Sequence, residues 1–306
     1  ILRGLDGLVT SLALSDEYIE HLVETMDGLP SFEPFRIAVD CANGATSHVA
    51  PLVFRRLGIP VLELNTSPDG RNINLGCGST HPEGLRRAVV ENGCRLGFAF
   101  DGDGDRVIMV DDRGNVIDGD GILLICAKYL NSLGKLTSSA IVTTIMSNMG
   151  LELALRAEGI STHRCPVGDL NVLEEMRRRD VRLGGEQSGH VIFSDLLPTG
   201  DGIATALQIL RIVIESGREL SELVAGFERF PQEIVNVRVS KKYELDSIPE
   251  IRDVIDEAEL KLAGRGRVVV RFSGTEPLLR IMIEGPEIEV VLENIFSYCI
   301  VVKGSR

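Results

Sequence analysis

Short apolar runs alternate with helix-like stretches along most of this chain, and that alternation is the strongest constraint on its fold. Residues 35–40 (FRIAVD) predict a strand, residues 49–57 a helix and residues 59–64 a second strand. A strand, a helix and a strand within about thirty residues are typical of a right-handed βαβ unit with parallel strands. The sequence therefore predicts an α/β fold.

The alternation continues for most of the remaining chain. A second cycle contains a helix over 82–92, buried strands over 96–100 and 107–110, a hairpin turn over 111–115 and a helix over 119–130. Segments 140–144, 151–158, 170–179 and 203–216 extend the pattern. From residue 235 the order changes to strand, helix (248–261), two strands (267–272 and 279–284) and a closing helix, which predicts a small α+β unit.

A chain of 306 residues exceeds what one hydrophobic core usually organises, so several domains are expected. We expect a linker or helix remnant over 1–30, an α/β domain over 31–132, a second α/β domain over 133–232 and a C-terminal α+β domain over 233–306.

Charge and cysteine content exclude several classes of protein. With 32 basic and 45 acidic residues the formal net charge is −13, which opposes binding to a nucleic-acid backbone. The six cysteines form no CxxC pair, which favours reduced thiols in a cytoplasmic protein. The apolar runs are too short to span a bilayer, so no membrane partner is expected.

The segment 96–110 (LGFAFDGDGDRVIMV) carries the strongest functional signal. Asp101, Asp103 and Asp105 alternate with glycines between two apolar strands. In an extended chain these three side chains share one face, where their carboxylates repel one another unless a cation lies among them. Ligation by oxygen alone suits a hard ion such as Mg²⁺.

Three other interpretations of this segment compete with a magnesium site. One is a solvated acidic turn. A calcium EF-hand needs Gly at its sixth loop position and Glu at its twelfth, where this chain has Arg106 and Asp112. An aspartyl phosphotransferase of the haloacid dehalogenase type would use Asp101 as nucleophile, but that pattern usually continues with Thr or Val where this chain has Gly104.

Two further loops present polar groups. Residues 184–190 (GGEQSGH) expose a carboxylate, an amide, a hydroxyl and an imidazole that suit sugar hydroxyls, although a plain polar turn fits equally well. Residues 271–277 (RFSGTEP) offer hydroxyls and backbone N–H groups that can hold an anion, with Arg271 adding bidentate contacts, although such a turn is common.

Together, FDGDGDR, GEQSGH and RFSGTEP resemble, in order and rough spacing, the metal, sugar and phosphate loops of the α-D-phosphohexomutase superfamily. The resemblance covers essentially the whole chain from residue 35. Residues 39–46 (VDCANGAT), residues 72–83 (NINLGCGSTHPE) and Gln187 are most similar to the bacterial phosphoglucosamine mutases, with phosphomannomutase/phosphoglucomutase relatives as the alternative.

The resemblance implies consecutive α/β domains with mixed sheets and an isomerase that moves a phosphoryl group between a phosphoserine and a hexosamine phosphate through a bisphosphate. It implies Mg²⁺ on Asp101, Asp103 and Asp105, with Arg106 supporting that site. The implied substrate-binding residues are Glu186, Ser188, Arg271, Ser273, Gly274 and Thr275. His190 is a candidate proton shuttle, with a hydrogen-bonded structural role as the alternative.

The superfamily's nucleophilic serine is expected in an N-terminal domain, in a loop that this sequence lacks. The nearest match contains Ser47, which follows the VDCANG strand and is expected to enter a helix instead. We therefore expect a missing N-terminal domain and no catalysis by these residues alone. A binding fragment and an Asp101-dependent phosphatase stay open as alternatives, as does a homodimer.

Overall fold

The predicted βαβ unit belongs to a five-stranded mixed sheet in the computed structural model, which describes residues 14–239, 256–257, 259–262, 266–273, 277–286 and 288. The strand order is β2-β1-β3-β4-β5. Strand β1 pairs in parallel with β2 and β3, while β4 runs antiparallel to both of its neighbours. The strands span β1 Ile37–Asp40, β2 Val61–Leu64, β3 Leu96–Phe100, β4 Val107–Val110 and β5 Val116–Ile117.

Helices cover both faces of this sheet because its central strands are apolar on both sides. On one face, Leu85 and Val89 of α3 (Glu83–Glu91) pack against Ala38 and Ala99. Neighbouring residues of a strand point to opposite faces, so Phe98 lies on the other face. There its ring stacks on Phe54 of α2 (Val49–Arg56), with the ring centroids 5.5 Å apart.

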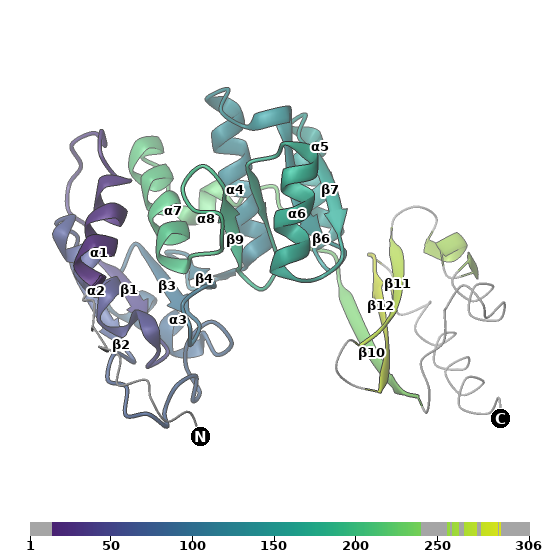
Figure 1. Cartoon of the computed structure of the whole chain (residues 1–306), viewed down its shortest axis with the longest axis horizontal. Helices are drawn as coiled ribbons and strands as arrows, with labels where there is room; N and C mark the ends of the chain where they lie inside the picture. Colours follow the sequence, from purple (N-terminus) through teal and green to yellow (C-terminus); the bar gives the residue numbers. More distant parts are fainter. Residues whose placement is uncertain are drawn as a thin grey trace, which may run out of the picture. The chain divides into compact units, whose positions relative to one another are not determined.

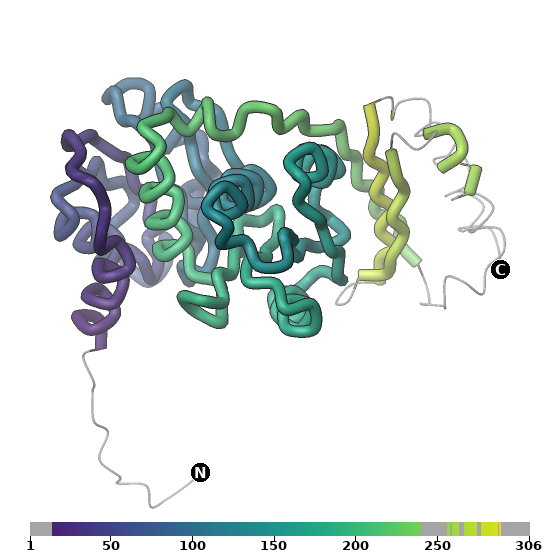
Figure 2. Tube along the Cα trace, turned by 90° about the horizontal axis from the view of Figure 1, so that it is seen from above, coloured from purple at the N-terminus to yellow at the C-terminus, as the bar shows by residue number. Residues whose placement is uncertain are grey.

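The chain divides into two compact units that are not continuous in sequence. The first unit comprises residues 1–129 and 188–225. Its second segment contributes β9 (Val191–Phe193), α7 (Gly202–Ser216) and the short α8 (Leu220–Leu223). Helix α7 packs on β4 and lies beside α1 (Ser15–Glu24), as Figures 1 and 2 show. Helix α4 (Gly119–Ser132) follows β5, and a 3-10 turn (Ala45–Ser47) precedes α2.

The second unit comprises residues 130–187 and 226–306. Strands β7 (Ser161–Cys165), β6 (Ala140–Thr144) and β8 (Leu183–Gly185) lie in that order and are parallel. Helices α5 (Met149–Ala157) and α6 (Asp169–Arg179) connect them. A 3-10 turn (Thr137–Ser139) precedes β6.

An antiparallel sheet of order β10-β12-β11 completes the described part of this unit. Its strands are β10 (Gln232–Arg238), β11 (Arg267–Phe272) and β12 (Leu278–Glu284), and they bury a core that includes Val237, Leu279 and Ile283.

The expected α/β class with mixed sheets and a small C-terminal α+β unit is confirmed. The helix expected over 248–261 lies largely outside the described residues, of which 256–257 and 259–262 are helical, and the closing helix also lies outside. Among the described residues, no helix combines the length and apolar character that crossing a membrane requires.

Candidate functional site

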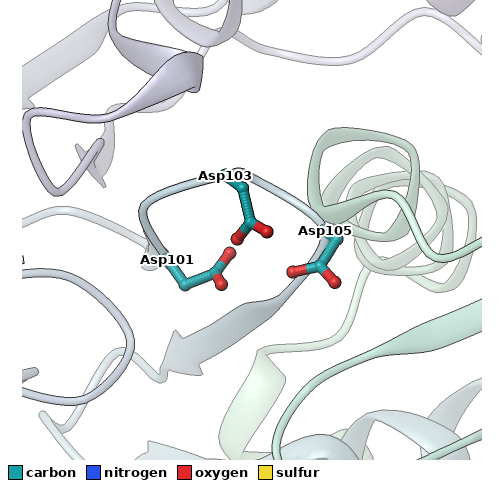
Figure 3. Close-up of side chains that lie close together, drawn as sticks. All are labelled: Asp101, Asp103 and Asp105. Atoms are coloured by element: carbon teal, nitrogen blue, oxygen red, sulfur yellow. The ribbon is translucent and has the colours of Figure 1, made fainter. Parts of the chain in front are cut away.

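The three aspartates of the predicted cation site converge at the carboxyl end of β3. Asp101, Asp103 and Asp105 lie in the loop between β3 and β4, hereafter the Asp loop (residues 101–105). One carboxylate oxygen from each lies within 4.8 Å of the others, and Figure 3 shows the three carboxylates facing one another. Asp101 is buried, Asp105 is half-buried and Asp103 is exposed.

The reason for this convergence differs from the sequence-based expectation. Residues 101–105 do not form an extended strand with side chains alternating between two faces; they form a curled loop in which Gly104 has φ +84°. Asp101 organises the curl, because its Oδ1 accepts hydrogen bonds from the backbone N–H groups of Gly104 and Arg106, both at 3.1 Å. The glycine is required because that φ is unfavourable for other residues.

Arg106 balances only part of the negative charge. Its guanidinium lies 2.9 Å (Nε) and 2.8 Å (Nη2) from Asp101 Oδ2, and its Nε lies 3.5 Å from Asp105 Oδ1. Three carboxylates against one guanidinium leave a formal charge of −2. Asp105 Oδ1 is buried and accepts no hydrogen bond from the described part of the chain. An oxygen-only donor set with excess negative charge and an unsatisfied buried oxygen fits a hard divalent cation.

The electrostatics of the aspartates reflect this crowding. Burial, together with a hydrogen bond that the Asp101 carboxyl donates to neighbouring Asp103, raises the pKa of Asp101 to about 6. The pKa of Asp103 is lowered, chiefly because its carboxylate accepts that hydrogen bond. A carboxyl that resists ionisation beside one that ionises readily is expected where like charges share a site.

Segments distant in the sequence support the Asp loop. Ala45 N donates to Gly102 O at 2.9 Å, and a Cβ on Gly44 would lie 2.2 Å from the same oxygen, so Gly44 must lack a side chain. On the opposite flank, Gly202 N donates to Gly104 O at 2.9 Å. Val107, which follows the loop, donates its N–H to Gly189 O at 3.1 Å.

His190 lies against the Asp loop. Its exposed fraction is 4%, its backbone forms an isolated antiparallel bridge with Arg106, and its Nε2 lies 3.7 Å from Asp105 Oδ2. Gly200 packs on the imidazole so closely that a Cβ there would lie 2.2 Å from Nε2. This buried position beside a carboxylate suits an orienting role. The proton-shuttle role stays a prediction.

The expected sugar-binding residues lie in different compact units. Glu186 belongs to the second unit, where its Oε1 accepts a hydrogen bond from Gly168 N at 2.9 Å. Next to it, Gln187 lines a cavity of about 330 Å³ together with Asn148 and Arg229. Ser188 is exposed and begins the returning segment of the first unit.

The two described members of the expected phosphate-binding set, Arg271 and Ser273, lie at the end of β11. Arg271 is opposite Arg280 of β12, and Ser273 is buried. Burial lowers the pKa of the Arg271 guanidinium, and the charge of Arg280 lowers it further. Paired guanidinium groups favour an anion between them. Gly274 and Thr275 lie outside the described residues.

Ser47 occupies the position expected of a residue entering a helix. It ends the 3-10 turn before α2, is 4% exposed, and its Oγ donates to Gly44 O at 2.7 Å.

Two features of the sites were missed from the sequence. One is Arg280, whose pairing with Arg271 depends on strand register. The other is the turn formed by residues 198–202 (PTGDG), which contacts the Asp loop through Gly202. Its Asp-Gly before the apolar run of α7 was an available signal, since Asp is a favoured N-cap residue.

Comparison with known proteins accounts for nearly all of the chain. Three models of phosphoglucomutase/phosphomannomutase match: α/β/α domain II over residues 16–114, α/β/α domain III over 118–230 and the C-terminal domain over 234–295.

Two relatives are identical to this chain at about half of the aligned positions. Phosphoglucosamine mutases from Symbiobacterium thermophilum and Geobacillus thermodenitrificans are 52% and 50% identical over 272 and 270 residues. These alignments cover 89% and 88% of this chain but 60% of each relative, so the chain spans about three fifths of the length of those proteins.

Solved structures share the fold. A phosphoglucomutase/phosphomannomutase family protein from Burkholderia thailandensis has a TM-score of 0.76 at 24% identity, covering 95% of this chain and 65% of that one. Aspergillus fumigatus N-acetylphosphoglucosamine mutase, in complex with GlcNAc-6P and magnesium, has a TM-score of 0.75 at 20% identity, covering 94% and 70%.

Proposed function

Because this chain belongs to the phosphoglucomutase/phosphomannomutase family, we propose that it forms the metal-, sugar- and phosphate-binding part of a phosphoglucosamine mutase. The reaction is the interconversion of glucosamine 6-phosphate and glucosamine 1-phosphate. The observation that carries the proposal is the Asp loop, with its formal charge of −2 and unsatisfied buried Asp105 oxygen. Relatives about 50% identical, all phosphoglucosamine mutases, support the choice of substrate.

Mg²⁺ is the proposed ion, and Asp101, Asp103 and Asp105 would hold it. When bound, the ion supplies positive charge that stabilises the oxygens of a transferring phosphoryl group. Arg106 holds Asp101 in place and contributes a further positive charge beside the loop. The magnesium in the Aspergillus fumigatus structure supports this choice.

The sugar phosphate would be bound by Glu186, Ser188 and residues of the 271–277 loop. The Glu186 carboxylate would accept hydrogen bonds from sugar hydroxyls, and the Ser188 hydroxyl would donate to them. The cavity beside Gln187 falls in the size range of small-molecule pockets. The phosphate that does not react would be held by Arg271, Ser273, Gly274 and Thr275. Arg280 joins this set because it lies beside Arg271.

The phosphoryl donor is proposed to be a phosphoserine outside these 306 residues. Its P–O bond breaks as a sugar hydroxyl oxygen forms a new bond to the same phosphorus, and the hydroxyl proton passes to the leaving serine oxygen, which gives a bisphosphate and a free serine. After the bisphosphate reorients, its other phosphate returns to the serine. Buried Ser47, whose hydroxyl is bonded to Gly44 O, is a poor alternative donor. A cytoplasmic location and a homodimer stay predictions.

The test measures binding and turnover separately. We expect the 306-residue chain to bind glucosamine 6-phosphate in calorimetry with Mg²⁺ present, and to form neither glucosamine 1-phosphate nor free phosphate. A longer product that carries a serine-phosphate loop should catalyse the interconversion, and glucose and mannose 6-phosphates should be poorer substrates.

Other outcomes would support other functions. Release of phosphate that is abolished by Asp101→Asn would favour the aspartyl phosphatase. Robust mutase turnover by the 306 residues alone would return Ser47 to consideration. Preference of the longer product for mannose or glucose phosphates would replace the proposed substrate by those of the phosphomannomutase/phosphoglucomutase relatives.

A further inference from the structure

We propose that Tyr18 and Asp201 are positioning residues for the Asp loop, so that helix α1 controls the affinity of the loop for its cation. The inference rests on the proposed metal site. Neither residue touches the aspartates; both act through the 198–202 turn.

Tyr18 holds one oxygen of Asp201. Its Oη donates to Asp201 Oδ2 at 2.6 Å, across 183 positions of sequence. Burial raises the pKa of Tyr18 far above its ordinary value, and the charge of Asp201 raises it further, so the phenol keeps the proton that it donates.

The other oxygen of Asp201 begins helix α7. Asp201 is the N-cap, and its Oδ1 accepts a hydrogen bond from Ala204 N at 2.9 Å. The carboxylate is therefore fixed by α1 on one side and α7 on the other. A capping residue held in this way fixes the backbone of its neighbours.

Of those neighbours, Gly202 contacts the Asp loop directly and Gly200 contacts it through His190. Gly202 donates to Gly104 O, and a Cβ on Gly202 would lie 2.8 Å from Arg106 O and 2.9 Å from the Phe100 ring. Gly200 packs on His190, which faces Asp105. A displaced 198–202 turn would therefore disturb the backbone at Gly104 and the support of Asp105 together.

Helix α1 is fixed to α7 at its other end as well. Arg211 of α7 donates to Thr25 O at 2.8 Å and to Asp27 O at 3.0 Å, just beyond the end of α1. Between these two ends of α1, Ile19 and Leu22 are buried. Because α1 is held at both ends, the Tyr18 hydroxyl has a defined position relative to the turn.

The experiment compares Tyr18→Phe with Tyr129→Phe in the 306-residue chain. Tyr129 of α4 also donates to a carboxylate of α7, but that carboxylate, Glu215, lies at the opposite end of α7 from Asp201. We expect both variants to lower the urea midpoint, whereas only Tyr18→Phe weakens Mg²⁺ binding in calorimetry, by about fivefold, less than is typical for a residue that contacts a metal ligand directly.

Asp201→Asn provides a second variant should Tyr18→Phe fold poorly. It keeps the oxygen that caps α7 but replaces the oxygen that accepts the hydrogen bond from Tyr18. We therefore expect it to weaken Mg²⁺ binding to a similar extent. In the double variant the two effects should not add, because both remove one interaction.

Failure of this inference can be told apart from failure of the metal site. If the unaltered chain binds no Mg²⁺, the proposed metal site is wrong, and this inference with it. If the unaltered chain binds Mg²⁺ and both Tyr18→Phe and Asp201→Asn bind it equally well, the metal site stands and the positioning role is wrong. Equal weakening by Tyr129→Phe would also overturn it.

Discussion

Each compact unit contains a buried carboxylate bonded to an arginine, and the two arrangements differ in how completely the charges are matched. In the first unit, Asp101 and Arg106 share their site with two more carboxylates, and Asp105 keeps a buried oxygen without a hydrogen bond from any described residue. In the second unit, Glu284 forms an ion pair with Arg267, and both carboxylate oxygens of Glu284 accept hydrogen bonds.

The Glu284 site is complete without a ligand. Glu284 is fully buried; its Oε2 lies 2.6 Å from Arg267 Nε, and its Oε1 accepts from Met149 N at 2.7 Å, at the first turn of α5. Arg267 also donates to Ser147 O at 2.5 Å. The positive end of the α5 dipole adds to the stabilisation of the carboxylate.

The difference separates a structural carboxylate from one suited to bind a cation. A matched pair with every oxygen bonded loses stability when one member is removed, because the other charge is left buried. An excess of carboxylates stores repulsion that a cation relieves.

Glu284→Gln should destabilise the second unit by about 3 kcal/mol, because the Arg267 guanidinium would remain buried without a matching charge. The measurement is urea unfolding of the variant beside Glu257→Gln, which breaks an exposed pair with Lys261 and should change little. Equal effects in the two variants would remove the proposed contrast between matched and exposed pairs.

Asp105→Asn should abolish stabilisation by Mg²⁺ while leaving the metal-free protein about as stable as before, since Asp105 Oδ1 accepts no hydrogen bond from the described residues. For the unaltered chain, Mg²⁺ at a hundred times its dissociation constant should add about 2.7 kcal/mol. Thermal melts with Mg²⁺ or with chelator measure both quantities. A large loss of metal-free stability would instead make Asp105 a structural residue.

Asp101 should give the metal-free chain an unusual pH dependence. Its folded pKa of about 6 lies above the ordinary value, so the folded state binds the proton more tightly. Its contribution to stability is full below about pH 4 and is lost as the pH rises through 6. Relative to Asp101→Asn, the unaltered chain should therefore be more stable at pH 5 than at pH 7, by on the order of 1 kcal/mol. Urea titrations at both pH values check the sign.

Glu175→Gln should have the smallest effect. Hydrogen bonds from Arg178 and Arg179 lower the pKa of Glu175 to about 2, so its contribution is present at neutral pH and is lost as the pH falls from about 4 toward 2. Because both arginine partners are exposed, the melting temperature at pH 7 should fall by less than about 2 °C. A larger fall would mean that exposed pairs matter here as much as Glu284.

Much of the fold was predictable where local signals are strong. The helix expected over 82–92 is α3, and the strands expected over 96–100 and 107–110 are β3 and β4. Strands β7 and β8 were missed: β7 (STHRC) is polar with one buried residue, and β8 (LGG) contains two glycines. Parallel pairing with β6 stabilises both, and that is a tertiary effect.

The site was predictable only where local sequence signals are strong, as the fold was. The spacing of Asp101, Asp103 and Asp105 carries its own signal, although the curl of the loop does not follow from the strand period. The 198–202 turn is different: Asp201 is recognisable in the sequence as the N-cap of a helix, but the contact of its neighbour Gly202 with Gly104 is not.

The distance along the chain between Gly104 and Gly202 affects how the protein forms during synthesis. The two residues are 202 − 104 = 98 positions apart, and their hydrogen bond joins the two segments of the first unit. At 5–20 residues per second, a ribosome needs roughly 5–20 s to make the intervening segment. A nascent chain would therefore carry all three aspartates for seconds before the hydrogen bond from Gly202 to Gly104 can form.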